Sequence, residues 1–207
     1  MVGSALFALG AFPAYADHVD VRIVSVTYFV GSLFFTAAGY LQYVQTINAG
    51  DGIGGTPRPA PTRYLAWQPA RLGWWSASVQ SIGTLLFNIS TFGALQASFS
   101  LQQQERLVWA PDMFGSIAFM IASTIAWVEV CRGWWRWRPG DAPWRIVALN
   151  LVGSLAFQLS AIAAFIRPAT GELVSIPVAN LGTFLGAVAF FVGAMLLIPE
   201  IDAAATP

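Results

Sequence analysis

The sequence has 207 residues, of which 57% are hydrophobic and 10% are charged, and its mean hydropathy is +0.63. These values lie outside the range of ordinary soluble domains and indicate an integral membrane protein. The formal net charge is zero, all ten basic residues are arginines, and no basic patch indicates nucleic-acid binding. Cys131 is the only cysteine, which excludes an internal disulfide.

The first segment, residues 1–16, is uncharged but short, and it allows two interpretations. Ala14-Tyr15-Ala16 is typical of a signal-peptidase site and would make the segment a cleaved signal peptide. Signal peptides begin with a basic region, however, and no lysine or arginine precedes Arg22. A repeated motif that begins at Gly3 favours a genuine, short first span.

Five uncharged runs follow in chain order, and each predicts a membrane span. They occupy residues 23–50, 72–104, 113–128, 146–166 and 173–199. About 20 apolar residues cross a hydrocarbon core of about 30 Å. The shortest run reaches this length when it is extended to residues 111–131. Together with the first segment, the runs predict an all-α polytopic membrane helix bundle of six transmembrane segments.

The repeated motif consists of a small pair of residues, two further residues and a phenylalanine, and it occurs once in each predicted span. The six copies begin at Gly3, Gly31, Gly83, Gly115, Gly153 and Gly186. They form three pairs, with copies about 30 residues apart inside a pair and further apart between pairs. This spacing predicts three tandem helical hairpins, with internal repeats over residues 1–47, 72–131 and 144–200, in one transmembrane domain over residues 1–207.

The motif glycines are interpreted as a packing seam between helices. Lipid supplies no hydrophobic drive between helices, so membrane helices associate by close packing over small residues and by hydrogen bonds. The glycines at Gly31, Gly83, Gly115, Gly153 and Gly186 are therefore expected at helix–helix contacts, each beside a phenylalanine.

Arginines and tryptophans favour one side of the predicted bundle. Seven of the ten arginines fall in the termini and loops on the side of both termini, and three fall on the other side. By the positive-inside rule, both termini should be cytoplasmic. Seven tryptophans lie on the same arginine-rich side, which is typical of an aromatic belt at the headgroup level. A lipid-headgroup or partner site is the alternative interpretation of these residues.

Five amide side chains lie within the predicted spans and must find polar partners: Gln80, Asn88, Asn150, Gln158 and Asn180. If they hold helices together, Gln80 and Asn150 should each hydrogen-bond a neighbouring helix. If they line a polar cavity near the pseudo-symmetry axis, Asn88, Gln158 and Asn180 should converge on a water-filled space. The sequence leaves both interpretations open.

Few ionisable groups are placed for chemistry. Glu129 precedes Arg132 by three residues, the spacing of an ion pair on a helix. Asp112 follows Pro111, which is typical of a helix first turn, and it is interpreted as a cap. His18 is the only histidine, so Ser–His–Asp sets and His-rich metal sites are excluded. No catalytic, cofactor-binding or metal-binding residues are expected.

Four stretches around motif glycines carry a family resemblance: residues 29–36, 80–88, 150–154 and 180–186. They resemble the YrhK-like domain of bacterial membrane proteins, and the likeness extends from Gly3 to Glu200. The resemblance implies a bacterial inner-membrane location and a helical-hairpin unit. It implies no catalytic or binding residue.

The sequence thus predicts a membrane protein without enzymatic activity or cofactor. Membrane lipids, a partner membrane protein and further copies of the chain are its expected partners, and nucleic acid is not. The alternative function is a small channel or transporter with an amide-lined path.

Overall fold

The computed structural model describes residues 1–49, 61–96 and 98–205, with side chains described as far as residue 198. These residues form an all-α protein. The helices that carry the motif are α1 (Val2–Ala11), α3 (Val21–Asn48), α4 (Leu72–Gly93), α6 (Ala110–Cys131), α7 (Ala142–Ala163) and α8 (Ile176–Ala205). Three short helical segments lead into α3 and α6, namely α2 (Pro13–Ala16), α5 (Leu101–Gln104) and the π-helix η1 (Glu105–Trp109).

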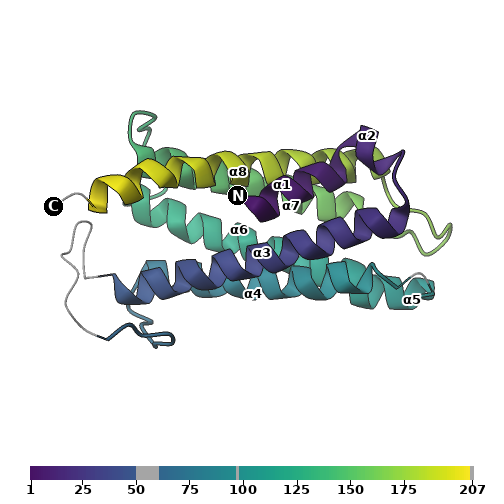
Figure 1. The fold of residues 1–207 in the computed structure, drawn as a ribbon, viewed down its shortest axis with the longest axis horizontal. Coiled ribbons are helices and arrows are strands. Elements are labelled where there is room, and N and C mark those ends of the chain that lie inside the picture. Colours follow the sequence, from purple (N-terminus) through teal and green to yellow (C-terminus); the bar gives the residue numbers. More distant parts are fainter. Residues whose placement is uncertain (50–60, 97, 206–207) are drawn as a thin grey trace.

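The six motif-bearing helices form a closed ring. In chain order each helix packs against the next, from α1 through α3, α4, α6 and α7 to α8, and α8 packs against α1. The helices run along the long axis of the molecule (Figure 1). The ring therefore encloses a central axis to which every motif-bearing helix presents one face.

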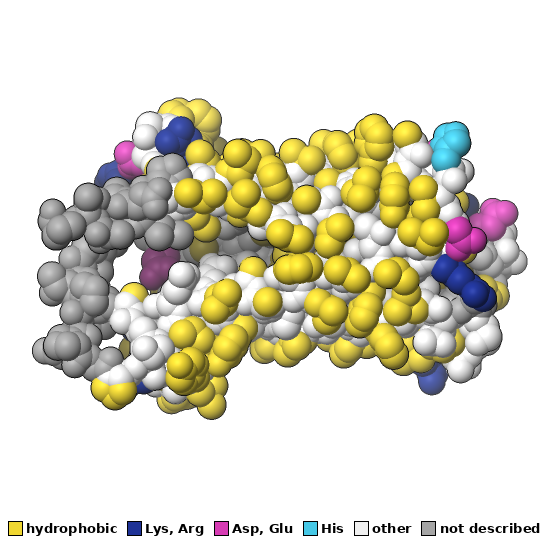
Figure 2. Space-filling view, viewed as in Figure 1, with side chains coloured by type: hydrophobic (Ala, Val, Ile, Leu, Met, Phe, Trp, Pro, Cys, Tyr) yellow, Lys and Arg dark blue, Asp and Glu magenta, His cyan; other side chains and the backbone are white. Residues whose placement is uncertain are grey.

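Four helical segments among the described residues are long and apolar enough to cross a membrane. They are Val21–Asn48, Leu101–Cys131, Ala142–Ala163 and Ile176–Ile198. Helix α1 is too short to qualify, and the 22-residue α4 carries many hydroxyl and amide side chains. Large hydrophobic side chains cover the outer surface of the bundle (Figure 2). The structure therefore has the features of a membrane protein, with four of the six predicted spans meeting the criteria of length and hydropathy.

The motif glycines lie where two helices come closest. A methyl group added at Gly31 would lie 2.8 Å from the ring of Phe7 on α1. At Gly83 it would lie 2.8 Å from the Phe119 ring and 3.1 Å from the Gly115 carbonyl oxygen, both on α6. Gly115 faces Gly83 in return, and Gly153 and Gly186 face each other in the same way between α7 and α8. All five glycines of the predicted seam thus lie at helix–helix contacts.

The second residue of the motif faces a different neighbour. The Ser32 hydroxyl lies 2.9 Å from the Thr91 hydroxyl, which links α3 to α4. The Ser154 hydroxyl lies 2.7 Å from the Ser123 hydroxyl, which links α7 to α6. These four side chains are buried. The glycines therefore join the helices of a pair, and the hydroxyl groups join one pair to the next.

The phenylalanine of the motif points to the central axis. Phe7, Phe87, Phe119, Phe157 and Phe190 form one buried cluster with Ala187, and Phe35 packs against it. We call these six aromatic side chains the phenylalanine cluster. The ring centroids of Phe87 and Phe119 are 5.0 Å apart, and those of Phe157 and Phe190 are 5.6 Å apart. The middle of the ring is therefore filled by hydrophobic side chains.

The helix that contains Asp112 begins earlier than the sequence indicates. Its N-terminus is fixed at Ser100, where a capping box with Gln103 satisfies backbone N–H groups. The helix then passes through the wide turn of η1 before Pro111, whose missing N–H cannot serve the Leu107 carbonyl. That carbonyl faces Gly93, where an added methyl group would lie 2.6 Å away. Asp112 is therefore inside a continuous helical segment, and the interpretation as an N-terminal cap is corrected.

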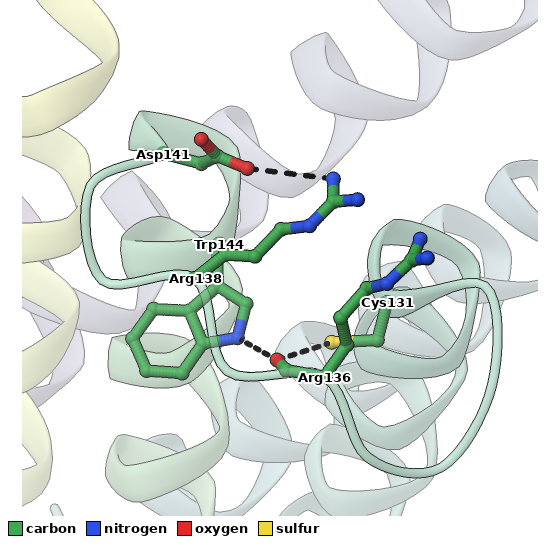
Figure 3. A network of polar contacts seen from close by, with 5 residues as sticks. All are labelled: Cys131, Arg136, Arg138, Asp141 and Trp144. Atoms are coloured by element: carbon green, nitrogen blue, oxygen red, sulfur yellow. Dashed lines mark hydrogen bonds and ion pairs between the residues drawn. The ribbon is translucent and has the colours of Figure 1, made fainter.

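Two tryptophans fix the loops at the arginine-rich end. Trp144 donates its indole N–H to the Arg136 carbonyl at 2.7 Å, and the Cys131 thiol lies 3.8 Å from the same oxygen (Figure 3). Trp74 donates in the same way to the Ala66 carbonyl at 2.8 Å, again eight residues upstream. The loops before α4 and α7 are therefore held by equivalent indole hydrogen bonds.

The expected ion pair between Glu129 and Arg132 does not form. Arg132 ends α6 with a left-handed backbone, φ 49°, so its side chain leaves the helical face that the i,i+3 spacing requires. The Glu129 carboxylate instead accepts the backbone N–H of Gly73 at 3.2 Å. Within the described part of the chain, the ion pair is between Arg138 and Asp141 at 3.5 Å (Figure 3).

Candidate functional site

A cavity lies between α3 and α8 at the arginine-rich end, and Met1 and Gly3 at the start of α1 also line it. Helices α4 and α7 begin eleven residues before their motif glycines, whereas α1 begins one residue before Gly3. The N-terminal end of α1 therefore lies about midway along the bundle (Figure 1), and the surface is hollowed between α8 and α3 (Figure 2). The cavity has a volume of about 430 Å³. We call it the central cleft, and define it by Gln42, Gln45, Gln80, Asn150 and Gly193.

Amide and hydroxyl groups line the inside of the central cleft. Gln80 on α4 and Asn150 on α7 both reach it, together with Gln42 and Gln45 on α3. Neither the Gln80 nor the Asn150 amide makes a hydrogen bond to another described residue. The Asn150 Oδ1 atom lies against α8 at Gly193, where an added methyl group would be 3.2 Å away. These two amides are therefore free to bind a polar group inside the cleft.

The hydroxyl groups of the central cleft are already engaged. Ser76 donates to the Ala122 carbonyl at 2.9 Å, and Ser123 bonds Ser154. Thr84 donates to the Ser81 carbonyl of its own helix at 2.8 Å. These three hydroxyl groups are therefore satisfied within the protein, and the free donors and acceptors of the cleft are the amides and the Ser4 hydroxyl.

The other predicted amides lie elsewhere. Asn88 donates its amide to the Thr36 hydroxyl at 2.8 Å and links α4 to α3. Gln158 donates to the Met113 sulfur at 3.0 Å and links α7 to α6. Asn180 is partly buried on α8 and does not line the cleft. The expected roles are thus exchanged, because Asn88 and Gln158 join helices whereas Gln80 and Asn150 line the cavity.

The mouth of the central cleft is apolar and faces the outside of the bundle. Phe34 and Leu41 on α3 and Leu197 on α8 line it, and their side chains are 46%, 61% and 43% exposed. No lining residue has an ionisable side chain in the part of the chain that the structure describes. A molecule in the cleft would therefore meet amides inside and aliphatic and aromatic carbon at the mouth.

Sequence reasoning alone did not identify Gln42 or Ser76 as cleft residues. Gln42 and Gln45 lie eleven and fourteen residues after Gly31, on the face of the helix that the motif directs inward. That periodicity was the available signal. Ser76, seven residues before Gly83, lies on the equivalent face of α4, but periodicity alone does not show that this part of the face borders a cavity.

Comparisons with protein-family models, with curated proteins and with solved structures give no match to this chain.

Proposed function

We propose that the protein is a non-enzymatic, six-span protein of the bacterial inner membrane that binds an uncharged amphiphile in the central cleft. One observation carries the proposal: the cleft joins an amide-lined interior to an apolar mouth on the outer surface of the bundle. The arginine asymmetry supports cytoplasmic termini, and hence a cleft in the cytoplasmic leaflet.

The packing of α1 and α4 supports counting both as spans. Helix α4 packs between α3 and α6, so the polar side chains that lower its hydropathy, such as Ser76 and Ser90, are buried inside the ring. Helix α1 packs between α3 and α8 and places Phe7 in the phenylalanine cluster. A helix that buries its polar groups inside the bundle, away from lipid, needs less hydropathy to reside in a bilayer.

The lining chemistry favours a headgroup with hydroxyl or carbonyl groups and no charge. An amide both donates and accepts hydrogen bonds, so Gln80 and Asn150 can serve either kind of group. The described side chains that line the cleft give a charged headgroup no counter-charge for its lost hydration, which is costly in a low-dielectric site, whereas the α-amino group of Met1, which also lines the cleft, would favour an anionic headgroup over a cationic one. The exposed carbon of Phe34 and Leu41 would pack against the acyl chain. A diacylglycerol has these properties.

The alternative of a channel or transporter uses the same amides but needs a path beyond them. Along α4, Gln80 and Thr84 line the central cleft and the next motif residue, Phe87, belongs to the phenylalanine cluster. The cluster fills the axis at that level. This arrangement supports a binding site that ends at the phenylalanine rings.

The proposal is tested with a photoactivatable diacylglycerol in nanodiscs that contain the full-length protein. Cross-links should map to α3 between residues 38 and 45 and to α8 between residues 193 and 197. Gln80→Leu and Asn150→Leu should each weaken binding about 3- to 20-fold, the equivalent of one membrane hydrogen bond. Gln158→Leu is the matched control, since the same change outside the cleft should leave binding unaltered.

Three results would overturn the proposal. The first is cross-linking spread evenly over the outer surface of the helices. The second is equal labelling by a phosphatidylglycerol analogue, which would show that the cleft does not select uncharged headgroups. The third is protection of the cleft by a co-purifying membrane protein, which would make a partner helix the occupant.

A further inference from the structure

A second cavity lies at the opposite end of the bundle, beyond the phenylalanine cluster. Its volume is about 520 Å³, and α3, α4, η1 and α6 contribute to it together with the segments that follow α4 and α7. Along α4, Phe87 is in the cluster and Ser90 and Gly93, one to two turns later, line this cavity. We call it the Asp112 cavity, and define it by Ser25, Gln96, Gln104, Trp109 and Asp112.

Asp112 has no partner in the structure. Its carboxylate makes no hydrogen bond and no ion pair with any described residue, and the side chain is only partly accessible. The ion pair found in the described chain, Arg138 with Asp141, is at the other end of the bundle. No arginine is among the described residues that line the cavity. A carboxylate that is partly withdrawn from water without a counter-charge is unfavourable, which favours a bound cation or a proton at this site.

The backbone before Asp112 is specialised. The π-helical turn of η1 carries Trp109, whose indole N–H donates to the Ala161 carbonyl of α7 at 2.9 Å. The Trp109 ring also packs edge-on against Phe165, with centroids 4.8 Å apart. Single π-helical turns are rare in proteins, and those that occur are often located at functional sites. Here the turn fixes an aromatic ring in the wall of the cavity beside the carboxylate.

We infer that the Asp112 cavity binds a small organic ammonium ion. The Asp112 carboxylate supplies the counter-charge, and the Gln104 side-chain oxygen accepts an N–H group, because the Gln104 amide nitrogen is already used on the Phe99 carbonyl at 3.3 Å. The rings of Trp109 and Phe99 line the same space, and aromatic faces attract ammonium groups. The volume suits a small organic molecule.

A metal ion fits the Asp112 cavity less well. Calcium takes six to eight oxygen ligands, and magnesium requires an octahedral set. The cavity has one carboxylate, and no group of three or more His, Cys, Asp or Glu side chains within the described residues is arranged to hold a metal ion. One carboxylate beside aromatic rings matches a single positive charge on an organic group.

The experiment uses the full-length protein in nanodiscs and two probes of the same shape, 2-phenylethylammonium and the uncharged 2-phenylethanol. Calorimetry should detect binding of the ammonium compound and much weaker binding of the alcohol. Asp112→Asn should weaken ammonium binding about 10- to 100-fold, the loss expected for a charge-assisted hydrogen bond. Glu105→Gln is the matched control, because this exposed carboxylate lies on η1 outside the cavity.

A second measurement does not depend on folding of the variant. A carbodiimide reacts with carboxyl groups within membranes, and mass spectrometry identifies the modified residue. The ammonium probe should protect Asp112 in the unaltered protein, and the alcohol should not. Equal binding of both probes, full ammonium binding by Asp112→Asn, or labelling of Asp112 that the ammonium probe does not slow would each overturn the inference. If Asp112→Asn is more stable to heat than the unaltered protein and neither binds the ammonium probe, Asp112 holds a proton rather than an ammonium ion, which would also overturn the inference.

Discussion

The three kinds of motif residue have three different neighbours. The glycine faces the other helix of its pair, the hydroxyl residue faces the next pair, and the phenylalanine faces the axis, as Gly153, Ser154 and Phe157 illustrate on α7. Each position therefore stabilises a different contact, and substitutions at each should fail for a different reason.

Gly153→Leu should lower the free energy of unfolding by about 1 to 3 kcal/mol, the range for overpacking a filled contact. Even a methyl group there would lie 2.9 Å from the Phe190 ring and 3.1 Å from the Gly186 carbonyl. Unfolding in mixed micelles measures the change. Gly140→Leu is the control, since an added methyl group at Gly140 has no neighbour within 4 Å. Equal stability of the two variants would mean that the glycine contact does not limit helix approach.

A double-mutant cycle on Ser32→Ala and Thr91→Val should give a coupling free energy of about 0.6 to 1.7 kcal/mol, as for other hydrogen bonds between membrane helices. The two hydroxyl groups join α3 to α4 at 2.9 Å. The control cycle pairs Ser32→Ala with Thr124→Val, because the Thr124 hydroxyl bonds only the Met120 carbonyl of its own helix. Additive effects in both cycles would contradict a bond between helix pairs.

At the scale of elements, α1 is short but fully integrated in the ring. The Phe7 ring lies within 6.3 Å, centroid to centroid, of the rings of Tyr28, Phe35, Phe87 and Phe157. One side chain of α1 thus touches residues from three other helices. Loss of α1 would therefore open the ring of helices between α3 and α8.

Phe7→Ala should lower the free energy of unfolding by about 3 to 5 kcal/mol, the usual result of emptying a buried aromatic site. Phe12→Ala should have a smaller effect, because Phe12 is 49% exposed.

The intact mass of the purified protein should also include residues 1–16, since removal of a signal peptide would remove Phe7 from the core. A mature chain that begins after Ala16 would contradict both expectations.

The sequence predicted the glycine contacts but not the placement of the amides. A glycine next to a phenylalanine at fixed spacing specifies a contact that two neighbouring helices can form locally, so the positions of Gly83 and Gly115 follow from periodicity. Whether Gln80 or Asn88 borders a cavity depends instead on the position of the N-terminal end of α1, a different helix. Asp112 was missed for a related reason, because Pro111 is typical of a helix start and the wide turn of η1 carries the helix through it.

At the scale of the whole molecule, the two ends of the bundle differ in charge. Among the described residues, six arginines are on the side of the central cleft and three are on the side of the Asp112 cavity. If the positive-inside rule applies to this chain, the central cleft is in the cytoplasmic leaflet and the Asp112 cavity is in the opposite leaflet.

Single-cysteine labelling tests this orientation on a Cys131→Ser background. An impermeant thiol reagent added outside intact cells should label Arg167→Cys and leave Arg136→Cys unlabelled, because the two positions are at opposite ends of the bundle. Labelling of both after the membrane is permeabilised is the control for access. Reaction at position 136 in intact cells would reverse the assignment.

The short α1 also gives the molecule an unequal cross-section. Within the described residues, six helices surround the axis at one end and five at the other, a difference of about 80 to 110 Å² for a helix 10 to 12 Å wide. In the proposed orientation the narrower end is in the cytoplasmic leaflet. The described residues thus form a bundle with a wider and a narrower end, and an amphiphile in the central cleft would reduce the difference between them.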